Sequence, residues 1–159
     1  MRYLSIEKAS ISNGLGIRCV LWVSGCTHHC SGCHNTCSWD CNNGLLFTNK
    51  EKLKILSYLE FPYVDGITFS GGDPMAIFNR ECILSFADEI KSKLPDKNIW
   101  LYTGYTIDEL LSDNVDLHNV DYLVDGEYVD SLRDLTLEFR GSSNQHIWKN
   151  VNGTWELFR

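Results

Sequence analysis

Three cysteines within eight residues, Cys26, Cys30 and Cys33, are the part of this sequence most able to do chemistry. Thiolates are the usual ligands of iron–sulfur clusters, and a cubane cluster with four cysteine ligands is closed. Three cysteines at this spacing can hold such a cluster and leave its fourth iron open to a second molecule, as catalytic metal sites keep an open position. The spacing therefore predicts a [4Fe–4S] cluster with one vacant iron.

Zinc is the alternative occupant of the same cysteines, because Cys, His and acidic ligands at short spacing are common in zinc sites. A fourth zinc ligand could come from His28, His29, His34, Cys37 or Cys41. Cys37 and Cys41 could also bind a second metal, or they are small residues that fill space. The cysteines by themselves favour the open cluster, with zinc kept as the alternative.

The composition limits the class of protein. A chain of 159 residues has room for one domain, which we expect to span residues 1–159. The net charge of −7 argues against binding to nucleic acid or to an anionic membrane. No apolar stretch near the N-terminus is long enough for a membrane span, and Glu7 and Lys8 interrupt any signal peptide. These features predict a cytoplasmic protein, in which the crowded cysteines bind metal rather than form disulfides.

The elements that position the cysteines follow from apolar runs and helix caps. We expect strands over 17–23, 66–70, 98–102 and 120–124, a helix over about 80–94, helices behind the capping boxes 48–51 and 106–109, and a C-terminal hairpin turning at Asn152-Gly153. Strands that alternate with helices predict an α/β fold with a parallel sheet. Four or five such units are too few for an eight-stranded barrel, so an open, partial barrel is expected.

The unusual sequences fall where these strands end, which is where ligands bind in parallel sheets. The cysteine loop follows the first strand, Gly71-Gly72-Asp73 the second, and Thr103-Gly104 the third. Glycines let the backbone approach a ligand closely, although each such segment could be an ordinary turn.

Arg18 and the loop 140–145 are two further candidates for binding. Arg18 could pair with a carboxylate, and the polar loop 140–145 could bind an anion or a partner chain, or be a solvated turn.

Together these residues resemble the radical S-adenosylmethionine enzymes, and more narrowly the activating proteins of anaerobic ribonucleoside-triphosphate reductases. The cysteine triad after one strand and Gly-Gly-Asp after the next are similar to the defining motifs of the larger group. The narrower resemblance covers nearly the whole chain and is carried by the segments 13–18, 24–30, 32–35, 70–74, 102–105, 123–126 and 140–145.

The resemblance implies a particular arrangement of cofactors in a partial barrel of the radical S-adenosylmethionine type. Cys26, Cys30 and Cys33 would hold the cluster, and its open iron would chelate the amino and carboxylate groups of S-adenosylmethionine. The remaining contacts would be Gly71, Gly72 and Asp73 at the methionine end, Gly32, Cys33 and His34 at the adenosyl part, and Thr103 and Gly104 in the same pocket. No acid–base residue is implied.

The resemblance also implies a reaction and its partners. An electron from a low-potential donor such as flavodoxin or ferredoxin would cleave S-adenosylmethionine, and the resulting radical would take hydrogen from a glycine of the large reductase subunit. Two alternatives remain open. One is activation of another glycyl-radical enzyme or of a small molecule. The other, from a different class, is a binding module stabilised by zinc.

Overall fold

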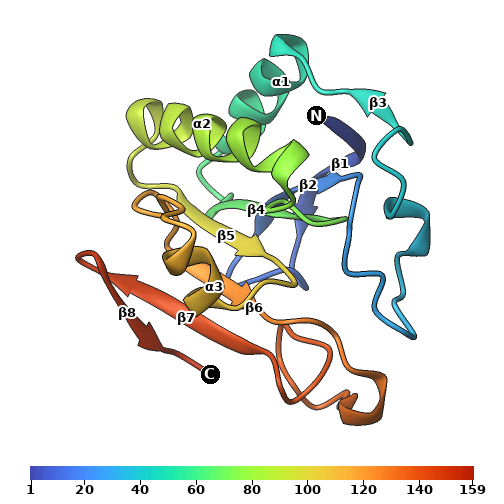
Figure 1. Ribbon diagram of the computed structural model, residues 1–159. Coiled ribbons are helices and arrows are strands. Elements are labelled where there is room, and N and C mark those ends of the chain that lie inside the picture. The colour runs from blue at the N-terminus through green and yellow to red at the C-terminus, as the bar shows by residue number, and fades with distance from the viewer.

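The computed structural model describes residues 1–159, and its centre is one mixed sheet of eight strands in the order β3-β1-β2-β4-β5-β6-β7-β8 (Figure 1). The strands are β1 (Arg2–Ser10), β2 (Arg18–Val23), β3 (Leu45–Leu46), β4 (Gly66–Gly71), β5 (Asn98–Tyr102), β6 (Tyr122–Asp125), β7 (His146–Val151) and β8 (Thr154–Leu157). The helices are α1 (Asn49–Leu59), α2 (Ile77–Lys93) and α3 (Ile107–Ser112), with short 3-10 turns η1 (Thr36–Ser38) and η2 (Asp130–Leu132).

The middle of the sheet confirms the predicted α/β fold. Strands β2, β4, β5 and β6 are parallel and in sequence order, and α1, α2 and α3 connect them. Both capping boxes form, with Thr48 before α1 and Thr106 before α3. The C-terminal hairpin of β7 and β8 is also present. Helix α2 begins a few residues before its predicted start.

The alternation of strands and helices predicted a parallel sheet, but the sheet is parallel only at its centre. Strands β1 and β3 pair antiparallel on one edge, and β7 and β8 pair antiparallel on the other. Sequence patterns did not reveal β1, because only Tyr3 and Ser10 of its nine residues are buried. The sheet therefore extends beyond its parallel centre on both sides, and the two chain ends lie near opposite edges (Figure 1).

Most of the core lies between the sheet and the two longer helices, which lie together over one face (Figure 1). Phe86 of α2 packs against Phe47 and Phe69 there. A smaller apolar cluster of Trp100, Val124 and Ile147 lies apart from this core. The helices thus cover one face of the sheet, and the loops that follow the parallel strands are left to build the site.

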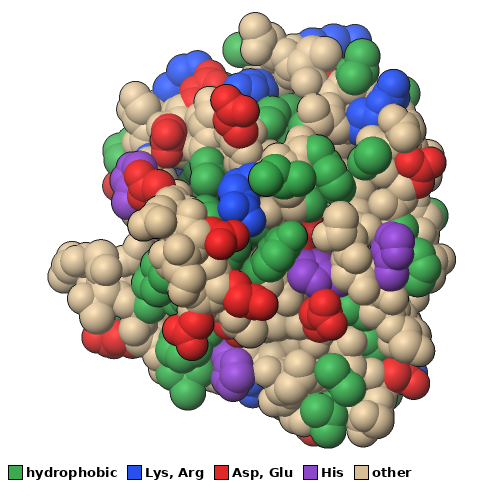
Figure 2. Space-filling model, viewed as in Figure 1, with side chains coloured by type: hydrophobic (Ala, Val, Ile, Leu, Met, Phe, Trp, Pro, Cys, Tyr) green, Lys and Arg blue, Asp and Glu red, His purple; other side chains and the backbone are tan.

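No helix combines the length and apolar character that crossing a membrane requires. Most of the Lys and Arg side chains visible in Figure 2 lie over α1 and α2, while acidic side chains and histidines are spread over the face below them.

Arg18 ties the parallel strands together at the end of the sheet where β2 begins. Its guanidinium is fully buried and donates to the Thr68 hydroxyl and to the backbone carbonyls of Ile67 and Asn98. It also donates to the side-chain carbonyl of Asn98. Burial lowers the pKa of Arg18 to about 10. The expectation that Arg18 pairs with a carboxylate is wrong, because its hydrogen-bond partners are uncharged oxygens of β4, β5 and Leu15.

We expect Arg18→Met to lower the free energy of unfolding by at least about 2 kcal/mol, because several buried acceptors lose their donor. Urea denaturation followed by circular dichroism measures the change. Arg133→Met is the matched control, since Arg133 is exposed, and its effect should stay within about 0.5 kcal/mol. Equal stability of the two variants would contradict the role given to Arg18.

Candidate metal and cofactor site

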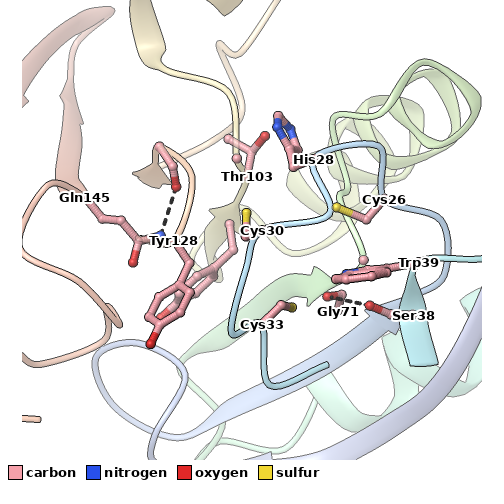
Figure 3. Close-up of a pocket in the computed structure, with 14 residues that line it drawn as sticks. Cys26, His28, Cys30, Cys33, Ser38, Trp39, Gly71, Thr103, Tyr128 and Gln145 are labelled. Carbon is pink, nitrogen blue, oxygen red and sulfur yellow. Dashed lines mark hydrogen bonds between the residues drawn. The ribbon is translucent and has the colours of Figure 1, made fainter. Parts of the chain in front are cut away.

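The three cysteines of the triad line one cavity of about 180 Å³ at the ends of β4 and β5. Figure 3 shows their sulfur atoms around a common space that is bordered by Thr103, Trp39 and Tyr128. Seven of the residues predicted from the sequence line this cavity: Cys26, Cys30, Cys33, Gly71, Gly72, Thr103 and Gly104. The structure therefore brings together segments that are about 80 positions apart in the sequence.

The other predicted residues lie around this cavity. His34 lines an adjoining cavity of about 270 Å³, which shares Cys33 and Gly71 with the first. Gly32 and Asp73 line neither. Gly32 has a positive φ of 76°, and a Cβ there would lie 2.7 Å from the side chain of Asp130, so this position is a close approach of two loops. Packing between these two loops of the chain is therefore enough to explain why residue 32 is a glycine.

Cys37 and Cys41 do not join the triad. Both are exposed, and neither lines the cavity of the three cysteines. The Cys37 thiol donates to the side-chain oxygen of Asn35, and Cys41 lines a neighbouring hollow together with Cys26 and Trp39. No three His, Cys, Asp or Glu side chains come close enough together to hold a single metal ion.

The surroundings of the thiols fit a cluster held by thiolates. Burial raises the pKa of Cys26, and the backbone N–H groups of His28 and His29 oppose that rise. Burial likewise raises the pKa of Cys30, opposed by the backbone N–H of Tyr128. The backbone N–H of Asn35 donates to Cys33 Sγ at 3.4 Å. Backbone N–H groups thus lie near the three sulfurs, and the thiols surround a space instead of meeting at one point.

The cysteine loop folds back on itself through η1. The backbone N–H of Gly25 donates to the Ser38 carbonyl, and that of Cys26 donates to the Trp39 carbonyl. The Ser38 hydroxyl donates to the Gly71 carbonyl at 3.2 Å and thereby joins the loop to the end of β4. Trp39 also stacks on His29, with ring centroids 4.6 Å apart. These contacts fix the loop around the cavity.

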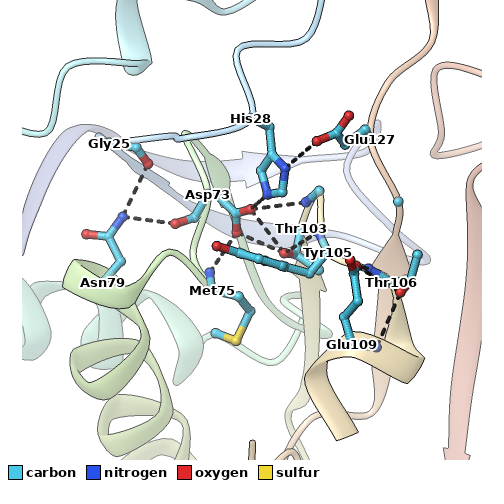
Figure 4. Close-up of polar contacts among 12 residues, drawn as sticks. Gly25, His28, Asp73, Met75, Asn79, Thr103, Tyr105, Thr106, Glu109 and Glu127 are labelled. Carbon is cyan, nitrogen blue, oxygen red and sulfur yellow. Dashed lines mark hydrogen bonds and ion pairs between the residues drawn. The ribbon is translucent and has the colours of Figure 1, made fainter. Parts of the chain in front are cut away.

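Asp73 is the polar centre next to the cavity (Figure 4). Its carboxylate is 1% exposed and accepts hydrogen bonds from the Met75 N–H at 2.7 Å, the Thr103 hydroxyl at 2.9 Å and the Gly104 N–H at 3.1 Å. His28 Nε2 lies 2.7 Å from the same carboxylate. The side chain of Asp73 therefore holds the cysteine loop to β5, and it is fully engaged by donors of the protein itself.

His28 connects Asp73 to a second carboxylate. Its Nδ1 lies 2.7 Å from Glu127, in the loop after β6. The contact with Asp73 raises the pKa of His28 to about 9, against burial and with help from Glu127, so the ring is a cation at neutral pH. A Cβ at Gly104 would lie 2.5 Å from the His28 ring, so only glycine permits this approach.

Several residues of the site were not identified from the sequence. His28 was considered only as a zinc ligand, and Tyr102, Tyr128 and Gln145, which line the cavity, were not considered individually. The signals for two of them were the segments 102–105 and 140–145, which contain Tyr102 and Gln145. The side chain of Gln145 donates to the Gly126 carbonyl at 2.9 Å (Figure 3). The loop after β6 thus forms the wall of the cavity opposite the cysteine loop.

Comparison with known proteins first defines the class, which is that of iron–sulfur proteins. Residues 12–148 match the family model described as a 4Fe-4S single cluster domain, which supports the predicted [4Fe–4S] cofactor. Three of the relatives that match nearly the full chain illustrate the similarity. A protein of Enterobacteria phage T4 is 40% identical over 98% of this chain and 99% of its own, and proteins of Salmonella typhimurium and Escherichia coli K12 are 45% and 43% identical over 92% of this chain and 97% of theirs. The chain belongs to the family of these relatives, the anaerobic ribonucleoside-triphosphate reductase-activating proteins.

The bridge of His28 between two carboxylates makes a prediction about stability. His28→Ala should lower the free energy of unfolding by about 1–3 kcal/mol, because it leaves the buried Asp73 without its cation. Glu127→Ala should cost less than about 1 kcal/mol, because the Glu127 side chain is 55% exposed. Urea denaturation under anaerobic conditions compares the variants. A larger loss in Glu127→Ala than in His28→Ala would show that Asp73 is not the partner that matters.

Proposed function

We propose that this protein is an activase that uses a [4Fe–4S] cluster and S-adenosylmethionine to generate a glycyl radical on the large subunit of an anaerobic ribonucleoside-triphosphate reductase. One observation carries the proposal. The three thiols share a single cavity with the strand-end residues Gly71, Gly72, Thr103 and Gly104. The family supports it, because the relatives are named as activating proteins of that reductase.

Cys26, Cys30 and Cys33 would hold the cluster, and the strand-end glycines would contact the methionine end of S-adenosylmethionine. When bound, the cluster supplies an electron that cleaves a carbon–sulfur bond of S-adenosylmethionine and so leads to the radical that takes hydrogen from glycine. The chain's own contribution is to bind and orient. The backbone N–H of Asn35 donates to Cys33, Asp73 and His28 fix the loop, and no side chain of the site is needed as an acid or base.

The architecture is consistent with an open, partial barrel of the radical S-adenosylmethionine type, formed as one domain over residues 1–159. Four parallel strands with helices on one face leave the loop ends accessible, and a flexible segment of a protein substrate could enter from that side. Glycine suits such a substrate because its Cα lacks a side chain. The seven cysteines are all free thiols, as expected in a reducing cytoplasm. The electron would come from a low-potential donor such as flavodoxin or ferredoxin.

Metal analysis tests the cofactor. Each of Cys26→Ala, Cys30→Ala and Cys33→Ala should abolish the cluster of the anaerobically prepared protein, which holds about four irons with matching sulfide when intact. Cys37→Ala and Cys41→Ala are matched controls, because these thiols lie outside the cavity, and they should keep the full iron content. One zinc without sulfide in the unaltered protein would favour the zinc-stabilised module.

The target is tested with the reductase itself. Mixing the cluster-loaded protein, S-adenosylmethionine, a low-potential reductant and the large reductase subunit should produce a glycyl radical signal by electron paramagnetic resonance. Omitting S-adenosylmethionine should remove the signal. An intact cluster that cleaves S-adenosylmethionine but gives no radical on this subunit would assign the activase to a different glycyl-radical enzyme.

A further inference from the structure

The segment 140–145 is folded into the wall of the cavity rather than out into solvent. Gln145 organises it. Its side-chain oxygen accepts from the backbone N–H groups of Gly141 and Ser142, at 2.9 and 3.2 Å, and its amide donates to the Gly126 carbonyl. Asn144 donates to the Glu127 carbonyl at 2.8 Å. The loop is thereby attached to the end of β6, and its arginine is held at a defined place.

Arg140 lines the cavity of about 270 Å³ that adjoins the three thiols. Its Nη1 donates to the Gln145 carbonyl at 2.7 Å, whereas its Nε is buried and has no hydrogen-bond partner. Arg140 forms no ion pair with any acidic side chain. Its Nη2 forms no hydrogen bond and is not enclosed by the protein, so this end of the guanidinium is available to a ligand in the cavity.

The charges of the side chains that line the two cavities indicate which kind of group Arg140 would bind. No Asp or Glu lines either of them, and Arg140 is the only Lys or Arg that does. The rest of the lining near Arg140 is aromatic or uncharged and includes Trp22, Tyr102 and Tyr128. In a chain of net charge −7, this cavity therefore presents one positive charge and no negative one. A guanidinium in such surroundings is suited to a carboxylate, to which it can donate two parallel hydrogen bonds.

The position of Arg140 relates this charge to the proposed cofactor. Its cavity shares Cys33 and Gly71 with the cavity of the three thiols. The amino group of an amino-acid ligand at the end of β4 can donate to backbone carbonyls, while its carboxylate, besides the iron that the proposed function gives it, can accept from the guanidinium. We propose that Arg140 binds the carboxylate at the amino-acid end of S-adenosylmethionine, an inference that rests on the proposed function.

The test compares two ligands that differ only in the carboxylate. Isothermal titration under anaerobic conditions measures the binding of S-adenosylmethionine and of decarboxylated S-adenosylmethionine to the cluster-loaded protein, to Arg140→Gln and to Arg133→Gln. Arg133 is the matched control, because it is exposed in the same loop and does not line the cavities. Iron content is measured for each variant, so that a lost cluster is not mistaken for lost binding.

Arg140→Gln should weaken the binding of S-adenosylmethionine by about 10- to 100-fold, as expected for the loss of a hydrogen-bonded charge, and leave the decarboxylated ligand nearly unaffected. Arg133→Gln should change neither. Equal weakening of both ligands, or no change in either, would overturn the assignment. Unchanged binding of S-adenosylmethionine with weaker binding of the reductase subunit would also overturn it and place the carboxylate on the partner. Failure of the unaltered, cluster-loaded protein to bind S-adenosylmethionine would instead refute the proposed function.

Discussion

The carboxylate of Asp73 is the constraint on which the site depends. A buried charge has to be compensated by donors and by an opposite charge, and here the donors come from three different segments. Met75 follows the carboxylate in the chain, Thr103 and Gly104 follow β5, and His28, which supplies the opposite charge, belongs to the cysteine loop. Satisfying this one group fixes the relative positions of the cysteine loop, the end of β4 and the end of β5. The cavity is what remains between them.

The glycines of the site serve this packing as much as they serve a ligand. A Cβ at Gly72 would lie 2.4 Å from the carbonyl oxygen of Gly25, and one at Gly104 would collide with the His28 ring. Gly25 in turn lies against the ring of Phe78. From the sequence, strand-end glycines predict close approach to a bound molecule. In this structure they allow close approach of another segment of the same chain. Contact with a ligand and contact with another segment both require a residue without a Cβ, so the sequence alone could not tell which of the two explains these glycines.

Local patterns were sufficient for much of the fold, because apolar runs and capping boxes report on neighbouring residues. They failed where partners are distant or exposure is high. Strand β1 buries only two of its nine residues and gives no apolar run, and the carbonyls bound by Arg18 lie in strands that the sequence cannot place beside it. The same limit holds in the site. The triad was predicted from its spacing, whereas the bridge from His28 to Asp73 and Glu127 spans 45 and 99 positions of sequence.

The distribution of charge explains why the site needs two cations with separate tasks. Burial raises the pKa of Cys26 and Cys30, so the cavity disfavours uncompensated negative charge. His28 cannot offset that charge, because it lies between Asp73 and Glu127 and is neutralised by them. Arg140 has no acidic partner and lines the adjoining cavity, so it is the one full positive charge directed at the ligand space. The first cation holds the loop in place, and the second remains available for a bound anion.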